Sequence, residues 1–294
     1  MRVWINKLNA RLHHFMAVPA ILLFGLFFLY PLTQGVGIAL TDSNGITTPN
    51  FVGLQNFIDF FKDDRARNDV LITIYFALGS APLLNLFGLM YALFLDRKLA
   101  GRGFVRAVVY LPAVISPLIM GYIWYFILQP ERGYLAHVLE GLGLGFLDVN
   151  WLGESSSALI VLVVVNVWQY VGMTMIIYLA GLQGISADFY EAARIDGAGK
   201  WASLRYVTLP LLYPSIKINV VTNIIGSLSV FEIIVALTDG GPGYATESLS
   251  IYILRMLYGS FTGYSTAVAL ILFVIILIPV VLFLRITRKS EYEL

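Results

Sequence analysis

The hydrophobic pattern of the chain is dominated by long stretches without Asp, Glu, Lys or Arg. Five such windows contain 30, 26, 24, 33 and 29 residues and cover 12–41, 70–95, 107–130, 155–187 and 256–284. A helix that crosses the hydrocarbon layer needs about 20 apolar residues, so each window is long enough for one span. A sixth apolar stretch, at about 211–238, is interrupted by Lys217 and Glu232.

The apolar stretches predict helices and exclude the strands of a membrane β-barrel. Barrel strands alternate in hydrophobicity over about ten residues, whereas 159–165 is continuously apolar. We predict an all-α integral membrane protein with six transmembrane helices. The expected spans are about 17–40, 69–95, 104–128, 158–181, 211–238 and 262–285. The first span is too long for the apolar region of a signal peptide and lacks a clean cleavage site, so we expect it to be retained.

The six spans define a transmembrane domain over 17–285 with a short segment at each end. Residues 1–16 place apolar side chains such as Trp4 and Leu8 against Arg2, Lys7 and Arg11. This pattern predicts an amphipathic helix that lies in the membrane interface. Residues 286–294 are expected to form a short tail. The stretch 56–61 has phenylalanines at helical spacing, which predicts a small surface helix after the first span.

Lys and Arg are distributed unequally between the two sides of the predicted membrane domain. The termini and the loops 96–106 and 182–210 together hold 13, and the remaining loops hold 5. Cytoplasmic loops carry the excess of positive charge, so both termini are predicted to be cytoplasmic.

Composition narrows the possible functions. The net charge of +1 does not suit a nucleic-acid-binding protein, and the absence of cysteine excludes thiol chemistry and Cys-ligated metal. The sequence Gly-Ala-Gly-Lys at 197–200 resembles the end of a phosphate-binding loop. However, Arg194 stands where the first glycine belongs and Trp201 where Ser or Thr should be. We therefore predict no ATP site, no metal site and no catalytic residue in this chain.

The loop 182–210 carries its own structural signals. Asp188 followed by Glu191 has the spacing of an N-terminal capping pair, and Gly197 stands where a helix would end. Helices shorter than about 12 residues are marginal in water. A short helix here is therefore expected to dock onto something.

Three stretches carry a resemblance to a known family. Glu-Ala-Ala-Arg-Ile-Asp-Gly-Ala at 191–198, followed by Leu209-Pro210, resembles the EAA loop of membrane subunits of ATP-binding-cassette importers, in particular the carbohydrate-uptake branch. Leu-Thr-Asp-Gly-Gly-Pro-Gly at 237–243 and Phe-Val-Gly-Leu-Gln-Asn-Phe at 51–57 are similar to runs in the maltose-type first permease and its lactose and glycerol-phosphate relatives. The maltose protein itself has two extra spans and a large outer domain, so the resemblance does not imply maltose specificity.

The resemblance implies a fold, a location and a set of partners. The fold would be the type I (MetI-like) importer permease fold with a cytoplasmic coupling helix, in a prokaryotic cytoplasmic (inner) membrane. The partners would be a second homologous permease, two ATPase subunits that bind ATP and Mg, and an extracytoplasmic sugar-binding protein. The residues implied to dock onto the ATPase are Glu191, Ala192, Ala193, Asp196 and Gly197. The alternative is a solvated helix on which Glu191 pairs with Arg194.

Polar side chains within two spans suggest where a substrate binds. Asn166, Gln169 and Tyr170 lie together on the fourth span, and Asn219, Asn223 and Ser227 form one stripe on the fifth. Amides, hydroxyls and aromatic rings suit a neutral sugar. The resemblance, counted from Glu191, implies a pathway of Gln169, Tyr170, Met173, Asn223, Ser227 and Val230. Hydrogen bonding between helices is the alternative for each polar residue, at about 0.6 kcal/mol per contact.

Glu232 is the one acid well inside a predicted span. It is expected either to form a salt bridge or remain a protonated buried acid, or to belong to the wall of the substrate pathway. Two alternative functions remain open. A glycerol-3-phosphate permease would require cationic groups in the cavity, and an ion-coupled secondary sugar transporter would leave the EAA loop unexplained.

Overall fold

The computed structural model describes residues 18–97, 99–129, 133–145 and 150–287. The predicted interfacial helix over 1–16 lies outside the described residues, as does the tail beyond Thr287, so both stay predictions. The chain forms two compact units. One contains Met1–Asp63 and Ile253–Ile271, and the other contains Asp64–Tyr252 and Leu272–Leu294.

Four of the described helices are long and apolar enough to cross a bilayer. They are Val18–Ala39, which includes the π-helical turn η1 (Gly25–Leu29) and α2 (Tyr30–Ala39), α4 (Asp64–Leu95), α8 (Ser155–Gln183) and α15 (Thr262–Thr287). The 32 residues of α4 correspond to about 48 Å, which exceeds the hydrocarbon thickness of about 30 Å. These helices overlap the first, second, fourth and sixth predicted spans.

The third predicted span is not one straight helix. α5 (Arg102–Val114) and α6 (Pro117–Leu128) meet at an angle of 97°. Pro117 opens α6, and the residue before it, Ser116, has φ −52° and ψ 134°. A proline disfavours helical backbone in the residue before it, so the helix stops at this point. The span predicted at about 104–128 is therefore divided into two helices.

The fifth predicted span is also divided. α12 (Tyr213–Leu228) ends before α13 (Glu232–Leu237), and Phe231 has φ −143° between them. The carbonyl of Val230, freed by the break, accepts a hydrogen bond of 2.8 Å from the Ser248 hydroxyl. Side chains can satisfy such carbonyls at membrane depth, so the break is compatible with a lipid environment. Among the described residues, four helices are thus long and apolar enough to span a membrane, or five if the bent pair counts as one span.

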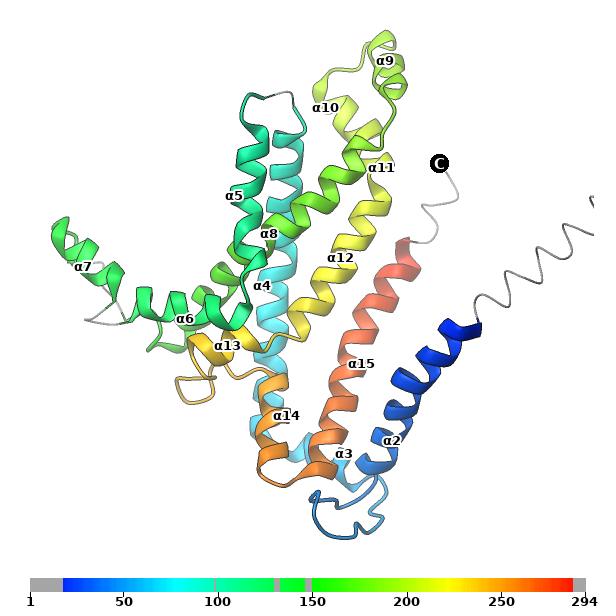
Figure 1. Ribbon diagram of the computed structural model, residues 1–294, viewed down its shortest axis with the longest axis vertical. Helices are drawn as coiled ribbons and strands as arrows, with labels where there is room; N and C mark the ends of the chain where they lie inside the picture. Colours follow the sequence, from blue (N-terminus) through cyan, green and yellow to red (C-terminus); the bar gives the residue numbers. More distant parts are fainter. Residues whose placement is uncertain (1–17, 98, 130–132, 146–149, 288–294) are drawn as a thin grey trace, which may run out of the picture. The chain divides into compact units, whose positions relative to one another are not determined.

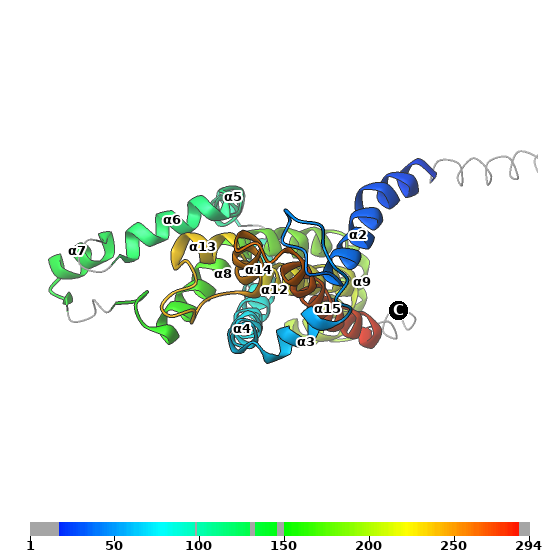
Figure 2. The ribbon, with the colours of Figure 1, turned by 90° about the horizontal axis from the view of Figure 1, so that it is seen from below.

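Small residues bring the helices of the larger unit close together. α8 contacts α4, α5 and α12, as Figure 1 shows. A Cβ atom on Gly172 would lie 2.3 Å from the Val109 carbonyl oxygen of α5, and one on Gly88 would lie 2.5 Å from Thr174. Close approach at small residues is the usual packing of membrane helices. Gly121 of α6 meets Ala236 in the same way, which places α13 along α6 (Figure 2).

The smaller unit contains the predicted surface helix. α3 (Gln55–Lys62) follows α2, and the Asn56 amide donates hydrogen bonds to the carbonyls of Ala39 and Thr41 at 2.8 and 2.9 Å. In the loop between these helices, hydrogen bonds from the Asn50 side chain and backbone lower the pKa of Asp42. The remaining described helices are α7 (Tyr134–Gly141), α9 (Ala187–Ile195), α10 (Lys200–Ser203), η3 (Leu204–Thr208), α11 (Leu209–Leu211) and α14 (Leu249–Tyr258).

Candidate substrate cavity and coupling loop

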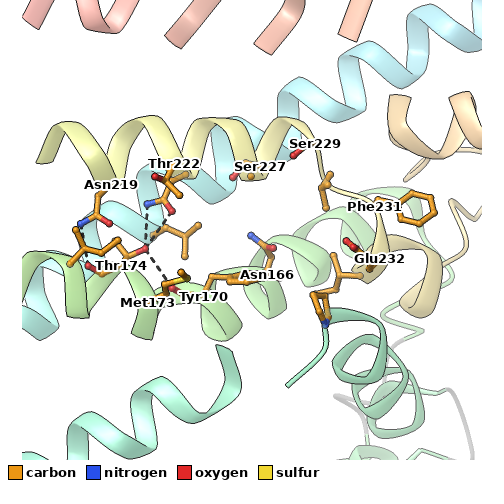
Figure 3. Close-up of a pocket in the computed structure, with 17 residues that line it drawn as sticks. Asn166, Tyr170, Met173, Thr174, Asn219, Thr222, Ser227, Ser229, Phe231 and Glu232 are labelled. Atoms are coloured by element: carbon orange, nitrogen blue, oxygen red, sulfur yellow. Dashed lines mark hydrogen bonds between the residues drawn. The ribbon is translucent and has the colours of Figure 1, made fainter. Parts of the chain in front are cut away.

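A cavity of about 360 Å³ lies where α8, α12 and the start of α13 converge (Figure 3). Its volume falls within the range of small-molecule sites. Seven of the eight residues predicted for the substrate pathway line it: Asn166, Tyr170, Met173, Asn223, Ser227, Val230 and Glu232. They come from α8 and α12, from the break after α12 and from the first residue of α13. The break allows Val230 and Glu232 to reach the same space as the middle of α12.

Gln169 is not part of the cavity lining. Its side chain is fully buried, and its amide nitrogen donates a hydrogen bond of 3.1 Å to the carbonyl of Ile115. Ile115 lies in the break between α5 and α6, where helical partners for its carbonyl are lost. Gln169 therefore holds the bend in place.

The polar cavity residues fall into two groups. Asn219 donates to the Thr174 carbonyl at 3.2 Å, and Asn223 donates to the Thr174 hydroxyl at 3.3 Å. These bonds join α12 to α8. Hydrogen bonding between helices, the alternative to substrate binding, is therefore observed for Asn219 and Asn223. Thr174 was not among the predicted pathway residues, although it follows Tyr170 by one helical turn.

Asn166 and Ser227 differ from that group because their polar atoms are not engaged. Ser227 is buried, and its hydroxyl has no hydrogen-bond partner among the described residues. Figure 3 shows the Asn166 amide directed into the cavity without a bond to the other residues drawn. A buried polar group without a partner carries a desolvation cost of about 1–3 kcal/mol. A ligand with hydroxyl groups would relieve that cost.

Glu232 is the first residue of α13 and lies exposed on the wall of the cavity. Within the part of the chain that the structure describes, it forms no ion pair. The geometry therefore supports neither the salt bridge nor the buried acid. The break between α12 and α13 explains why Glu232 is not a buried acid inside a continuous span. It places the carboxylate at a helix N-terminus, where negative charge is stabilised.

The loop between α8 and α12 contains the predicted short helix, α9. Its N-cap is Ser186, whose hydroxyl accepts a hydrogen bond from the Asp188 backbone at 3.3 Å. The predicted Asp188–Glu191 capping pair is therefore wrong, because the helix begins earlier and a serine supplies the cap. The predicted C-terminal stop is correct: Gly197 has φ +80°, and the Ala198 amide donates to the Ala193 carbonyl at 2.8 Å.

The residues predicted to dock onto an ATPase lie at the surface of this loop. Glu191, Ala192, Asp196 and Gly197 are exposed, and Ala193 is buried beneath them. The alternative pairing of Glu191 with Arg194 is not observed among the described residues. Arg194 instead donates to the Tyr190 carbonyl at 3.3 Å. The Glu191 carboxylate is thus available to a partner.

One hydrogen bond links α9 to the chain that leads into α12. The Tyr190 and Thr208 hydroxyls lie 3.3 Å apart, and Thr208 ends η3. α9 also follows α8 directly. The loop helix is therefore attached to α8 through the backbone, and to the segment that leads into α12 also through this bond.

Comparison with known proteins identifies the family of this chain. Residues 85–291 match the family described as the binding-protein-dependent transport system inner membrane component. The chain belongs to this family. The permease is therefore a membrane-embedded transport subunit with several membrane-crossing helices.

Relatives match the permease over almost their full length. A probable permease for starch degradation products from Thermoanaerobacterium thermosulfurigenes is 32% identical, with 94% of each chain covered. The trehalose/maltose permease of Thermococcus litoralis is 33% identical, with 95% of each chain covered. The crystal structure of a bacterial transporter that imports the acidic polysaccharide alginate contains a chain with a TM-score of 0.80 and 25% identity. That match covers 98% of this permease and 99% of that chain.

Replacing Glu232 with glutamine in the permease is expected to reduce the initial rate of substrate uptake roughly fivefold. A hydrogen bond to a charged group exceeds a neutral one by about 1 kcal/mol, which is the loss expected at a cavity wall. Thermal stability should change little, because Glu232 has no ion pair among the described residues and an exposed charge at a helix N-terminus contributes less than about 1 kcal/mol. The matched control is Glu140→Gln, an exposed acid on α7 outside the cavity. Unchanged uptake by the Glu232 variant would exclude the cavity role.

Proposed function

We propose that this permease forms half of the translocation pathway of an ATP-driven importer for a neutral sugar or oligosaccharide. The observation that carries the proposal is the cavity beside the coupling loop, in which Asn166 and Ser227 present unengaged polar groups. Amides and hydroxyls can donate to and accept from sugar hydroxyls, and Tyr170 adds an aromatic ring. The names of the starch-product and trehalose/maltose relatives point to the same substrate class.

The charge of the cavity favours a neutral substrate over an anionic one. Among the described residues that line it, there is no Lys, Arg or His, and Glu232 contributes a negative charge. Recognition of phosphate or of a carboxylated sugar relies on cationic donors, usually arginine. A glycerol-3-phosphate substrate and an acidic polysaccharide such as alginate are therefore disfavoured.

The proposed mechanism assigns a part to the coupling loop. α9 would dock into a cleft of an ATPase subunit, where Glu191 offers its carboxylate to a basic group and Ala192 permits close approach. Closure of two ATPase subunits around ATP and Mg would move α9. The movement would reach α8 through the chain and α12 through the Tyr190–Thr208 bond. The cavity would then switch from inward-facing to outward-facing.

The proposal includes a complete assembly. A second homologous permease would supply the other half of the pathway, and an extracytoplasmic binding protein would deliver the sugar. Both termini would lie in the cytoplasm, as the 13-to-5 distribution of Lys and Arg indicates. The alginate transporter supports this arrangement, because it was crystallised with a periplasmic protein that carries an alginate pentasaccharide.

Reconstitution of the assembled transporter in sealed vesicles tests the function. Uptake of a sugar panel that contains maltose, trehalose, maltopentaose and alginate pentasaccharide is expected to require ATP and the binding protein, and to include at least one neutral member. Dissipating ion gradients should have no effect on uptake. Uptake that persists without ATP hydrolysis but stops when an ion gradient collapses would identify a secondary transporter instead.

A further inference from the structure

A second hollow lies along the C-terminal part of α13. This outer groove has a volume of about 710 Å³ and shares no lining residue with the cavity. Glu232 and Ile233 at the start of α13 line the cavity, whereas Val235, Ala236 and Leu237 border the groove. Its lining comprises Tyr122, Tyr125, Leu152 and the segments 235–239 and 241–242. Figure 1 shows α13 and α6 well below α9, with the first turns of α4 lower still. If α9 is cytoplasmic, the groove faces the extracytoplasmic side.

The chemistry of the outer groove combines aromatic faces with oxygen atoms. Tyr122 and Tyr125 are three residues apart on α6 and therefore share a face of that helix, and Tyr122 is 48% exposed. Thr238, Asp239 and the main chain at Gly241 contribute the polar part of the lining. Tyrosine offers an apolar ring together with a polar hydroxyl, which suits a ligand with both C–H faces and hydroxyl groups. A lipid tail would leave the polar part of the groove unmatched.

Hydrogen bonds within the loop 238–247 fix the wall of the outer groove. The Thr246 hydroxyl donates to the Gly241 carbonyl at 2.6 Å, and the Gly241 amide donates to the Thr238 carbonyl at 2.9 Å. Behind this wall, Arg65 of α4 donates two hydrogen bonds to the fully buried carboxylate of Glu247, at 2.7 and 2.9 Å. A binding surface held in shape before the ligand arrives loses less entropy on binding.

We propose that the outer groove is an entry site that binds sugar rings of an oligosaccharide before they enter the cavity. The inference rests on the proposed function and on its orientation. It adds a binding site separate from the cavity, and Tyr122 and Tyr125 are its principal contacts. A disaccharide can be enclosed by the cavity alone, whereas a longer chain needs further surface. The groove should therefore favour long substrates over short ones.

The double variant Tyr122→Ala/Tyr125→Ala tests the entry site in the reconstituted transporter with its binding protein. The variant removes the two aromatic faces on which sugar rings would stack, so KM for maltopentaose should rise roughly tenfold. KM for maltose should change less than about twofold, because a disaccharide fits within the cavity and needs little contact with the two rings. Tyr122→Phe/Tyr125→Phe retains the rings and should restore most of the affinity. Tyr134→Ala is the matched control, because Tyr134 is 71% exposed on α7 outside the groove.

A labelling measurement keeps the test independent of the folding of the double variant. The chain has no native cysteine, so Leu152→Cys introduces a single thiol into the groove lining. Maltopentaose delivered by the binding protein should slow maleimide labelling of this thiol in the assembled transporter, and maltose should slow it much less.

Three results would overturn the entry site. The first is equal KM values for variant and wild type at both chain lengths, without protection of the thiol. The second is a wild-type transporter that takes up disaccharides only. The third is a loss of binding-protein-stimulated ATPase activity that does not depend on sugar length, which would make the groove a docking surface for the protein. A wild-type transporter that takes up no sugar of the panel would instead refute the proposed function, and the entry site with it.

Discussion

Replacing Gly197 with valine is expected to abolish ATP-driven uptake while the permease still inserts into the membrane. Gly197 has φ +80°, a left-handed backbone conformation that costs residues with a Cβ atom about 1–2 kcal/mol and is a genuine outlier for β-branched ones. A Cβ atom at this position would meet nothing within 4 Å, so the effect would come from the backbone and not from a clash inside the chain.

The size of this effect follows from the marginal stability of α9. The helix has 9 residues and ends with the hydrogen bond from Ala198 to Ala193, which requires the left-handed turn at Gly197. Losing this bond would free the last turn of a helix that is too short to persist alone. Glu191 would then no longer be presented in a fixed orientation to the ATPase.

Two substitutions serve as controls for the Gly197 variant. Gly197→Asn should retain much of the uptake, because asparagine tolerates the left-handed conformation. Gly199→Val adds the same bulk two residues later at φ −70°, where nothing lies within 4 Å, and should transport nearly normally. Membrane abundance, recovery of the ATPase with the permease and initial uptake rates are the measurements. Normal uptake by Gly197→Val together with normal ATPase recovery would show that α9 does not couple the subunits.

The sequence predicts the long helices and groups residues that line the cavity, because both depend on local patterns. A window of more than 20 residues without charge predicts a span correctly where one unbroken helix fills the window, as α8 does. The spacing of Asn166 and Tyr170 places them on one face by helical periodicity. The family motif at 191–198 locates the loop helix and its terminal glycine, although the serine cap outside the motif is missed.

The breaks in the third and fifth spans could not be read from hydrophobicity. Pro117 was a visible signal, but Pro82 and Pro279 lie inside helices that continue through them, so a proline alone does not predict a break. At the end of α12, the broken carbonyl of Val230 is satisfied by Ser248, which is 18 residues away in sequence. Gln169 stabilises the other break through Ile115, across a separation of 54 residues. Such tertiary partners decide where a helix can end, and periodicity does not reveal them.

The Arg65–Glu247 pair leads to the second large expected effect. Glu247→Ala should lower the free energy of unfolding of the permease in detergent by about 3 kcal/mol. Glu247 is fully buried, and its removal leaves Arg65 without the carboxylate that accepts its two hydrogen bonds. Because the Arg65 side chain is 28% exposed, water can partly solvate it, and the effect should fall at the lower end of the range for buried pairs.

An ion pair on the surface is the control that distinguishes the effect of burial from the effect of charge pairing on the free energy of unfolding. Arg67 pairs with Asp64 on the same helix, and both side chains are largely exposed, so Arg67→Ala should cost less than about 1 kcal/mol. The double variant Arg65→Ala/Glu247→Ala should be more stable than Glu247→Ala alone, because the guanidinium is removed together with the carboxylate that accepts its hydrogen bonds. Thermal unfolding in detergent would measure all three variants. Equal stabilities of Glu247→Ala and Arg67→Ala would show that the buried pair does not anchor the loop 238–247.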